Sequence, residues 1–336
     1  MKNPFIAGVD IGGSHITAAL VNLPTSTIVP GSTARKTIRA QDPAGHIIGT
    51  WCDAIAASFT SLPSAEYPKK IGIAMPGPVD YEEGICYIKN QGKYESLYGL
   101  NIKELMAARL KIAPQDIRMM NDALCFLQGE VAGGAVNGYT SAIGLTLGTG
   151  LGSALFRNGI TTDADLWHAP FLEGIAEDYL SSRWFVQRYQ ATSGTSVKNT
   201  KELVEHIPSD PSIKFLFEEF ARNLGDFLAS VIHAHHPEVI VLGGNISQSY
   251  RLFLPELEQR LLAQQVQTPL RIAMLGENAH IIGAAGVSFV EQPHVHACDL
   301  QRAGRGLDHG THDLLDAELL DIRTAGQLPQ HQRDRL

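Results

Sequence analysis

Two glycine-rich segments of this chain could hold phosphate groups. The first runs from Asp10 to Ser14, and the second runs from Leu147 to Gly152. Glycine has no Cβ, so neighbouring backbone N–H groups can come close to phosphate oxygens. One such turn between strands is usually only a hairpin turn. Two turns at matching places in two halves could close on a polyphosphate from either side, with these candidate ligands: Gly12, Gly13, Ser14, Gly148, Thr149 and Gly150.

Asp10 stands directly before the first turn. A carboxylate beside a phosphate repels it unless a cation lies between them. Asp10 therefore predicts a Mg²⁺ ion, held by this carboxylate through water and by the phosphates themselves. The alternative is that Asp10 only caps the turn through its own backbone.

Asp122 could act on a proton. It follows a predicted strand at residues 117–120 and begins a predicted helix, which is where α/β folds place functional groups. A carboxylate at this place can take the proton of an attacking hydroxyl group. It can also cap the helix N-terminus, and without further context capping is the more common role.

Several classes of protein are disfavoured. Neither turn is a P-loop or a dinucleotide fingerprint, because Gly-x-x-x-x-Gly-Lys-Ser/Thr is absent and the second turn leads into a strand. The net charge of −8, without a Lys/Arg stripe, argues against nucleic acid as a partner. The 4 cysteines lie far apart, and no apolar run reaches the ~20 residues of a membrane span. We expect a cytoplasmic protein without zinc, nucleic acid or membrane contacts.

The elements that would position these residues alternate between strands and helices. Each half begins with strand, glycine turn and strand. Strands are predicted at residues 5–11, 16–21, 71–75, 117–120, 142–147, 152–156, 239–242 and 270–275. Helices are predicted at residues 44–59, 102–110, 174–189, 215–235, 250–262 and 281–290. This alternation predicts an α/β protein of two related domains with mixed sheets that face one ligand.

The domain boundaries follow from this repeat. We predict an N-terminal domain at residues 1–120 and a C-terminal domain at residues 121–280, with the helix at 281–292 packing back on the first domain. Residues 293–336 contain no lysine and are rich in Arg, His, Asp and Gln. They are predicted to be a tail outside the fold.

Five motifs occur in order along the chain: Asp10 to Ile16, Pro76 to Asp80, Asn121-Asp122-Ala123, Leu147 to Gly152 and Leu242-Gly243-Gly244. Together they resemble the ROK family of sugar kinases (repressors, open reading frames and kinases), within the actin-like ATPase superfamily. The resemblance covers about residues 5–291. It implies an α/β fold of two ribonuclease H-like domains with an interdomain cleft. It also implies ATP against the second domain, a sugar deep in the cleft, and a homodimer.

The resemblance implies roles for individual residues. Asp122 matches the catalytic base and Asn121 a sugar ligand, while Asn90 resembles a sugar-contacting asparagine. The turns Gly12–Ser14 and Gly148–Gly150 match the two phosphate loops. Gly243 and Gly244 match the turn under the adenosine of ATP.

One region departs from the family pattern. Most members carry Glu-x-Gly-His, a cysteine-rich zinc loop, and then Leu-Glu. Here the cysteines are missing, and Asp165 stands where glutamate is usual. His168 aligns with the family's histidine and Glu177 with its sugar-contacting glutamate, with Glu173 as a competitor for that place. We expect no zinc, with packing of the short segment around Phe171 in its place and His168 either contacting the sugar or hydrogen-bonded in the core.

The resemblance implies ATP-dependent phosphorylation of a hexose or N-acetylhexosamine hydroxyl, with O6 of glucose or a close relative as the first expectation. One alternative is a sugar-binding actin-fold ATPase with weak or no kinase activity. Another is a sugar-responsive regulator, which would carry a DNA-binding helix-turn-helix before the first motif. The hairpin at Asp10 begins almost at Met1, which disfavours the regulator.

Overall fold

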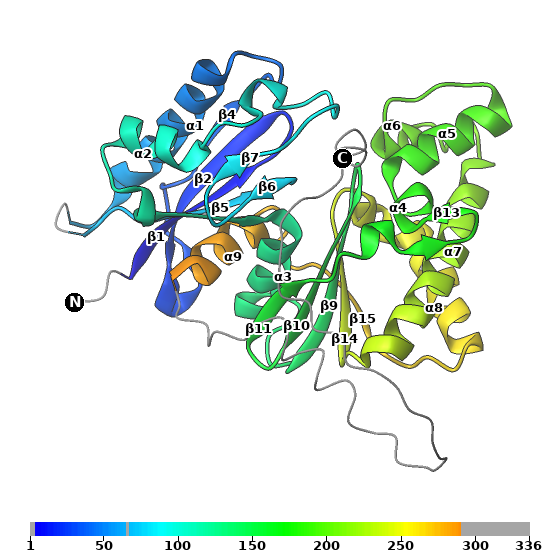
Figure 1. Cartoon of the computed structure of the whole chain (residues 1–336). Helices are drawn as coiled ribbons and strands as arrows, with labels where there is room; N and C mark the ends of the chain where they lie inside the picture. The colour runs from blue at the N-terminus through cyan, green and yellow to red at the C-terminus, as the bar shows by residue number, and fades with distance from the viewer. Residues whose placement is uncertain (1–3, 65–66, 290–336) are drawn as a thin grey trace, which may run out of the picture. The chain divides into compact units, whose positions relative to one another are not determined.

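The computed structural model describes residues 4–64 and 67–289. Two main sheets organise this part of the chain (Figure 1). The first has six strands in the order β3-β2-β1-β5-β8, with β4 beside β2: β1 (Phe5–Ile11), β2 (His15–Asn22), β3 (Thr27–Ile28), β4 (Ala34–Thr37), β5 (Ile71–Met75) and β8 (Ile117–Asn121). The second has five strands in the order β11-β10-β9-β14-β15: β9 (Ser141–Leu147), β10 (Leu151–Arg157), β11 (Ile160–Asp163), β14 (Val239–Gly243) and β15 (Leu270–Ile272).

The two sheets repeat one plan, as the duplicated pattern predicts. In each, an antiparallel hairpin closes through a glycine turn, and its first strand pairs in parallel with one later strand. In the first sheet Asp10 pairs with Ala74, and Met75 pairs with Asn121. The carboxyl ends of β1, β5 and β8 therefore meet at one edge of the sheet, which is where Asp10 and Asp122 lie.

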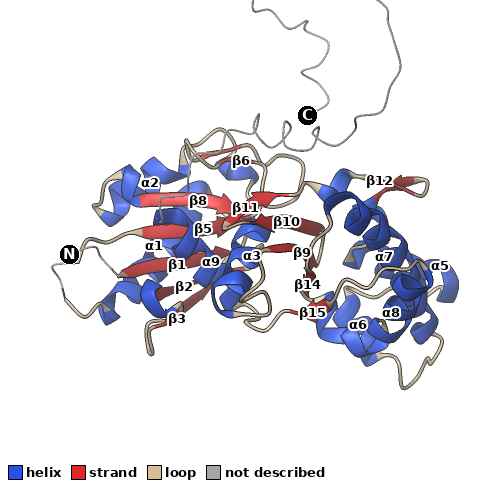
Figure 2. Ribbon diagram, turned by 90° about the horizontal axis from the view of Figure 1, so that it is seen from below, coloured by secondary structure: helices blue, strands red, loops and turns tan. Residues whose placement is uncertain are grey.

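Nine helices accompany these sheets within residues 4–64 and 67–289. They are α1 (Ala44–Ser58), α2 (Ile102–Leu110), α3 (Asp122–Gly133), α4 (Ala176–Tyr179), α5 (Ser182–Ser193), α6 (Thr200–Glu205), α7 (Ile213–His235), α8 (Leu254–Ala263) and α9 (Asn278–Phe289). Figure 2 shows α5, α6, α7 and α8 grouped beside the second sheet. The long α7 places a stripe of buried apolar residues, including Phe217, Phe220 and Leu224, in the core of that half. No helix in this part of the chain is both long and apolar enough to cross a membrane.

Two helix predictions are wrong at their N-terminal ends. The predicted helix at 174–189 is instead strand β13 (Gly174–Ile175), short α4 and separate α5, because Gly174 pairs with Phe171 of β12 (Pro170–Phe171) in a hairpin. The predicted helix at 250–262 begins at Leu254, because residues Ile246–Leu252 form a 3₁₀ segment, η6, before it. Proline at the start of α8 is compatible with this later beginning.

Helices α3 and α9 cross with their backbones in contact. A Cβ built at Gly129 of α3 would lie 2.1 Å from the carbonyl oxygen of Ala279. Gly8 of β1 approaches the same helix, since a Cβ there would lie 2.0 Å from the carbonyl oxygen of Ile281. Buried Ile281 and Ile282 also pack in one cluster with β1 and β2. The last described helix therefore packs on the first sheet, although the domain boundaries themselves stay a prediction and residues 293–336 lie outside the described part.

Glu130 is a fully buried carboxylate near the end of α3. It accepts hydrogen bonds from the backbone N–H groups of Ala135 at 2.7 Å, Met274 at 3.1 Å and Leu275 at 2.9 Å. A buried carboxylate is tolerated only when it is well hydrogen-bonded. Glu130 thus ties the segment that leads into α9 to the C-terminal end of α3.

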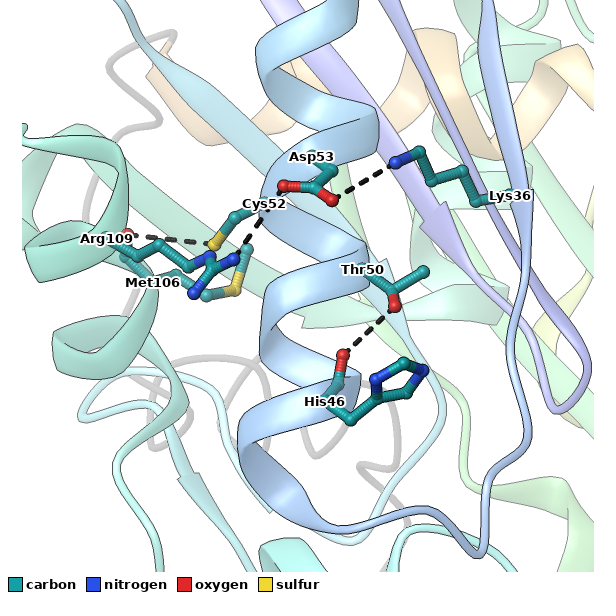
Figure 3. A network of polar contacts seen from close by, with 7 residues as sticks. All are labelled: Lys36, His46, Thr50, Cys52, Asp53, Met106 and Arg109. Carbon is teal, nitrogen blue, oxygen red and sulfur yellow. Dashed lines mark hydrogen bonds and ion pairs between the residues drawn. The ribbon is translucent and has the colours of Figure 1, made fainter.

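Helices α1 and α2 cover the first sheet mainly by apolar packing. On the surface, Asp53 of α1 pairs with Lys36 at 3.2 Å and approaches Arg109 at 3.9 Å (Figure 3). All three side chains are about half exposed, so each pair contributes at most about 1 kcal/mol. The neighbouring Cys52 is buried, and its thiol donates to the carbonyl oxygen of Met106 at 3.9 Å.

Candidate active site

Asp10 lies at the sheet edge, close to Asp122 and to two histidines. Burial raises the pKa of the Asp10 carboxyl, and Asp122 adds to that rise, while His280 and His15 oppose it. A partly buried carboxylate with a raised pKa gains from a nearby cation. In the described residues no group of three His, Cys, Asp or Glu side chains could hold a metal ion by itself. The partly buried carboxylate of Asp10 is chemically suited to a Mg²⁺ ion that takes its other ligands from water and phosphates.

Tyr94 supports the first glycine turn through a hydrogen bond. The N–H of Gly12 donates to the carbonyl oxygen of His15 at 3.0 Å, which closes the hairpin. The hydroxyl of Tyr94 donates to the carbonyl oxygen of Gly12. Tyr94 is fully buried and packs edge-on against Trp51, with 5.4 Å between ring centroids. A Cβ at Gly13 would meet no atom within 4 Å, so the outer face of this turn is open to a ligand.

Asn121 and Asp122 share one backbone donor at the start of α3. The N–H of Ala123 donates to Oδ1 of Asn121 at 2.8 Å and to Oδ1 of Asp122 at 3.0 Å. The capping role is thus filled mainly by Asn121, which is the N-cap residue. Within the described residues, Oδ2 of Asp122 makes no hydrogen bond, so it is available to accept a proton.

Tyr81 and Asp163 are neighbours of this pair that sequence reasoning missed. The hydroxyl of Tyr81 donates to the carbonyl oxygen of Met75 at 2.9 Å and contacts the Asn121 side chain. Burial raises the pKa of Tyr81, and the Asp122 charge raises it further. Asp163, at the end of β11, is also close enough for the Asp122 charge to raise its pKa, after the larger effect of partial burial. Tyr81 directly follows the motif Pro76 to Asp80 without being part of it, and Asp163 has no motif around it.

The second glycine turn is braced by Glu177. The N–H of Gly148 donates to the carbonyl oxygen of Gly150 at 3.0 Å. The carbonyl oxygen of Gly148 in turn accepts from the N–H of Ser182 at 2.8 Å. Glu177 accepts from the N–H of Leu151 at 3.0 Å. A Cβ at Gly150 would lie only 2.4 Å from Glu177 Oε2, so glycine is required there for this carboxylate to approach.

Gly243 and Gly244 lie against the same turn. Gly244 has a positive φ of 83°, and a Cβ there would lie 2.4 Å from the carbonyl oxygen of Leu147. A Cβ at Gly243 would likewise lie 2.4 Å from the ring of Phe126. The end of β14 and the end of β9 are therefore in backbone contact, which brings the predicted adenosine turn beside the predicted phosphate loop.

A pocket of about 760 Å³ opens beside these two turns. It is bordered by the second glycine turn, by α5 and α6, and by the segment after Gly244. Its lining residues are Thr149, Ser182, Arg183, Val186, Gln187, Lys198, Asn199, Thr200, Lys201, Val204, Glu205, Asn245, Gln248 and Ser249. Arginine and two lysines against one glutamate give this pocket a positive charge that suits a nucleotide.

The structure does not bring all the residues predicted to contact the sugar together around Asp122. His168 is about half exposed, with its Nδ1 3.3 Å from Oδ1 of Asp165. Asn90 is exposed with a positive φ of 59°, and exposed Glu173 contacts the Tyr179 hydroxyl through its N–H at 3.4 Å. No contact described for Asn90 or His168 in residues 4–64 and 67–289 joins either of them to Asp122.

Two sheets of one plan, each with a glycine turn in its hairpin, and Asp10 and Asp122 at the strand ends of the first sheet define an α/β protein with a duplicated fold. The ROK family pattern matches residues 6–163 and 172–289, so the chain belongs to the ROK family. The break in this match, at residues 164–171, falls on the region that lacks the cysteines.

Named relatives agree with this assignment. An N-acetyl-D-glucosamine kinase of Histophilus somni is 26% identical over 314 residues, which cover 83% of this chain and 97% of that protein. An N-acetylgalactosamine kinase of a Shewanella species is 26% identical over 242 residues, which cover 64% of this chain and 76% of that protein. A ROK family glucokinase of Streptomyces griseus, solved with glucose and AMPPNP, has a TM-score of 0.68 at 23% identity over 84% of this chain and 98% of that one. The predicted family and fold class are confirmed.

Proposed function

We propose that this chain is an ATP-dependent sugar kinase that phosphorylates a hydroxyl group of a hexose or N-acetylhexosamine. The observation that carries the proposal is the position of Asp122. It lies at the sheet edge close to Asp10, with one oxygen held by the Ala123 N–H and the other available. Phosphoryl transfer requires positioning and charge neutralisation more than covalent help. Asp122 would position the hydroxyl at this edge, and a Mg²⁺ ion at Asp10 would neutralise the phosphate charge.

Asp122 acts as general base in this proposal. The sugar hydroxyl would approach Oδ2 and give up its proton as its oxygen attacks the γ-phosphorus of ATP. The bond between that phosphorus and the β–γ bridging oxygen would break, and ADP would leave. Oδ1 stays fixed by the Ala123 N–H, so the carboxylate does not rotate away. Tyr81 holds the Asn121 side chain beside it, and Asn121 in turn would orient the sugar.

ATP would lie along the second half of the chain. The pocket beside Gly243 and Gly244 would take the adenosine, and the turns Gly12–Ser14 and Gly148–Gly150 would hold the phosphates. A Mg²⁺ ion brought with ATP would neutralise charge on the phosphates, with Asp10 holding it through water.

The sugar would lie against Asp122, with Asn90, Asn121, His168 and Glu177 as further contacts. The relatives named above act on N-acetylglucosamine and N-acetylgalactosamine, and the structural neighbour holds glucose. We propose O6 of glucose or of a close relative as the acceptor. Homodimerisation and a cytoplasmic location belong to the same proposal.

The test is a coupled ATP-consumption assay on about a dozen hexoses and N-acetylhexosamines, with wild type and Asp122→Asn. We expect one or a few sugars to stimulate turnover, and the variant to lose at least about a hundredfold in turnover while binding MgADP as wild type does. ATP hydrolysis that no sugar stimulates would favour the weak or inactive sugar-binding ATPase instead. A variant that keeps most of its turnover would refute the role of Asp122.

A further inference from the structure

Arg183 connects the nucleotide pocket to the second glycine turn. It is the second residue of α5, directly after Ser182, whose N–H donates to the carbonyl oxygen of Gly148 at 2.8 Å. Its guanidinium donates to Oε1 of Glu177, and Oε2 of the same carboxylate accepts from the N–H of Leu151. Arg183 also lines the pocket that contains Thr149 of the turn.

We propose that Arg183 binds the phosphate groups of the nucleotide and that Glu177 positions both this guanidinium and the glycine turn. The inference rests on the proposed function, since it assumes that a nucleotide occupies this pocket. It assigns Glu177 a role on the phosphate side, whether or not the carboxylate also meets a sugar.

The side chain has the donors for this role. A guanidinium carries five N–H donors in a planar fork, and only one of its amino groups is used on Glu177. The side chain is 58% exposed, whereas that of Glu177 is only 20% exposed. The partly buried carboxylate therefore holds one amino group of the guanidinium, and Arg183 itself lines the pocket with donors that Glu177 does not use. Arginine suits phosphate because two parallel N–H groups match two phosphate oxygens.

The position of Arg183 favours the phosphates over the base. Its partner carboxylate contacts Leu151 at the end of the turn Gly148–Gly150. Asn245, Gln248 and Ser249, which follow Gly244, also line the pocket. A guanidinium next to the glycine turn is thus at the end where the predicted phosphate loop lies.

A simple surface ion pair is the competing explanation, because exposed pairs contribute little by themselves. Arg188 provides the matched comparison on the same helix. It pairs with Glu219 at 3.0 Å, its side chain is 45% exposed, and it does not line the pocket. If ion pairing were the whole role of Arg183, removing either arginine would have similar consequences.

The test is calorimetric titration of full-length wild type, Arg183→Gln and Arg188→Gln with MgADP and, separately, with adenosine. We expect Arg183→Gln to weaken MgADP binding about tenfold or more, and adenosine binding less than twofold. Arg188→Gln should change neither. Arg183→Lys should fall between wild type and Arg183→Gln, because lysine keeps the charge but loses the fork.

Two results would overturn the inference. One is MgADP binding by Arg183→Gln within twofold of wild type. The other is an equal loss for MgADP and adenosine, which would indicate a general disturbance of the pocket. If wild type itself binds no MgADP, the nucleotide site of the proposed function fails as well, so the two failures are distinguishable.

Glu177→Gln tests the positioning role. We expect it to weaken MgADP binding about threefold or more, because the amide keeps an acceptor for Leu151 but loses the charge that holds Arg183. A variant with unchanged MgADP affinity and a raised KM for the sugar alone would contradict the coupling through Glu177.

Discussion

Gly283 of α9 lies so close to Cys125 of α3 that a Cβ there would be 1.8 Å from the Cys125 carbonyl oxygen. Backbone cannot yield as a flexible side chain would, so Gly283→Ala must separate the two helices. We expect it to lower the free energy of unfolding by about 3 kcal/mol. Gly286→Ala on the same helix is the control, since a Cβ there meets no atom within 4 Å, and alanine in a helix should stabilise by about 0.5–1 kcal/mol. Urea denaturation of both variants checks this, and equal stabilities would contradict the crossing.

Asp10→Asn should stabilise the protein while abolishing activity. Burial raises the pKa of Asp10, so at neutral pH the folded chain carries a charge that is less favourable than in the unfolded chain. The charge therefore lowers the free energy of unfolding of wild type relative to the asparagine variant. This loss is complete above the raised pKa of Asp10 in the folded chain, and it vanishes as the pH falls below the ordinary pKa of an aspartate. We expect a gain of about 1 kcal/mol at pH 7 that shrinks at pH 4, with turnover reduced at least about a hundredfold. Urea denaturation at both pH values gives the answer, and a gain that grows toward pH 4 would refute the assigned direction.

Phe171→Ala should loosen the sugar side of the site. Phe171 packs edge-on against Tyr179 and Phe227 at centroid distances of 5.5 and 5.6 Å. The hairpin that contains it begins at Pro170, shortly after His168. We expect the KM for the sugar to rise about tenfold with the KM for ATP unchanged, because a misplaced contact of about 1 Å has effects of this size or larger. Leu172→Ala is the matched control, since Leu172 is 64% exposed at the tip of the hairpin. The measurement is steady-state kinetics with the sugar and ATP varied in turn. Equal KM values for the sugar in the two variants would refute the role of Phe171 in ordering the sugar side.

Cys52 should be inert toward alkylating reagents at neutral pH. Burial raises the pKa of its thiol to about 11, and the thiolate is the reactive form. Because the folded pKa lies above the ordinary value, the contribution of the thiol to stability is complete below that ordinary value and is lost as the pH rises toward 11. Native protein treated with iodoacetamide at pH 7.5, a pH chosen to lie about one unit below the ordinary thiol pKa, should show no modified Cys52 by peptide mass spectrometry. Urea-unfolded protein serves as the positive control, and rapid labelling of the native form would contradict the burial.

The features predicted from sequence are those carried by local pattern. Glycine turns between apolar strands, and an Asn-Asp pair where a strand meets a helix, determine their own conformation within a few residues. The central strands of both sheets, the start of α3 and the position of Asp10 follow from such segments, whereas the edge strands β3, β4 and β11 do not. Gly174 departs from its predicted helix because it pairs with Phe171 in a hairpin, while the residues around Glu177 carry a helical pattern.

The residues missed by sequence reasoning act over long separations. Tyr94 reaches a turn that lies 82 positions earlier, and Glu130 binds amides about 145 positions later. Arg183 has no distinguishing neighbours in sequence, and its importance depends on the fold that brings Glu177 to Leu151. Such contacts depend on how distant elements pack, which no local pattern encodes.

The packing of α9 on the first sheet has a consequence for biosynthesis. Ile6, Ala19 and Val21 are buried partly by Ile281 and Ile282, which are translated more than 250 positions after β1 begins. At about 5–20 residues per second, the ribosome needs roughly 15–50 s to reach that helix. During this interval the nascent first sheet shows an uncovered apolar face. The N-terminal half therefore cannot complete its core before α9 has been translated. A prematurely terminated chain would leave this apolar face exposed, as a surface that chaperones recognise.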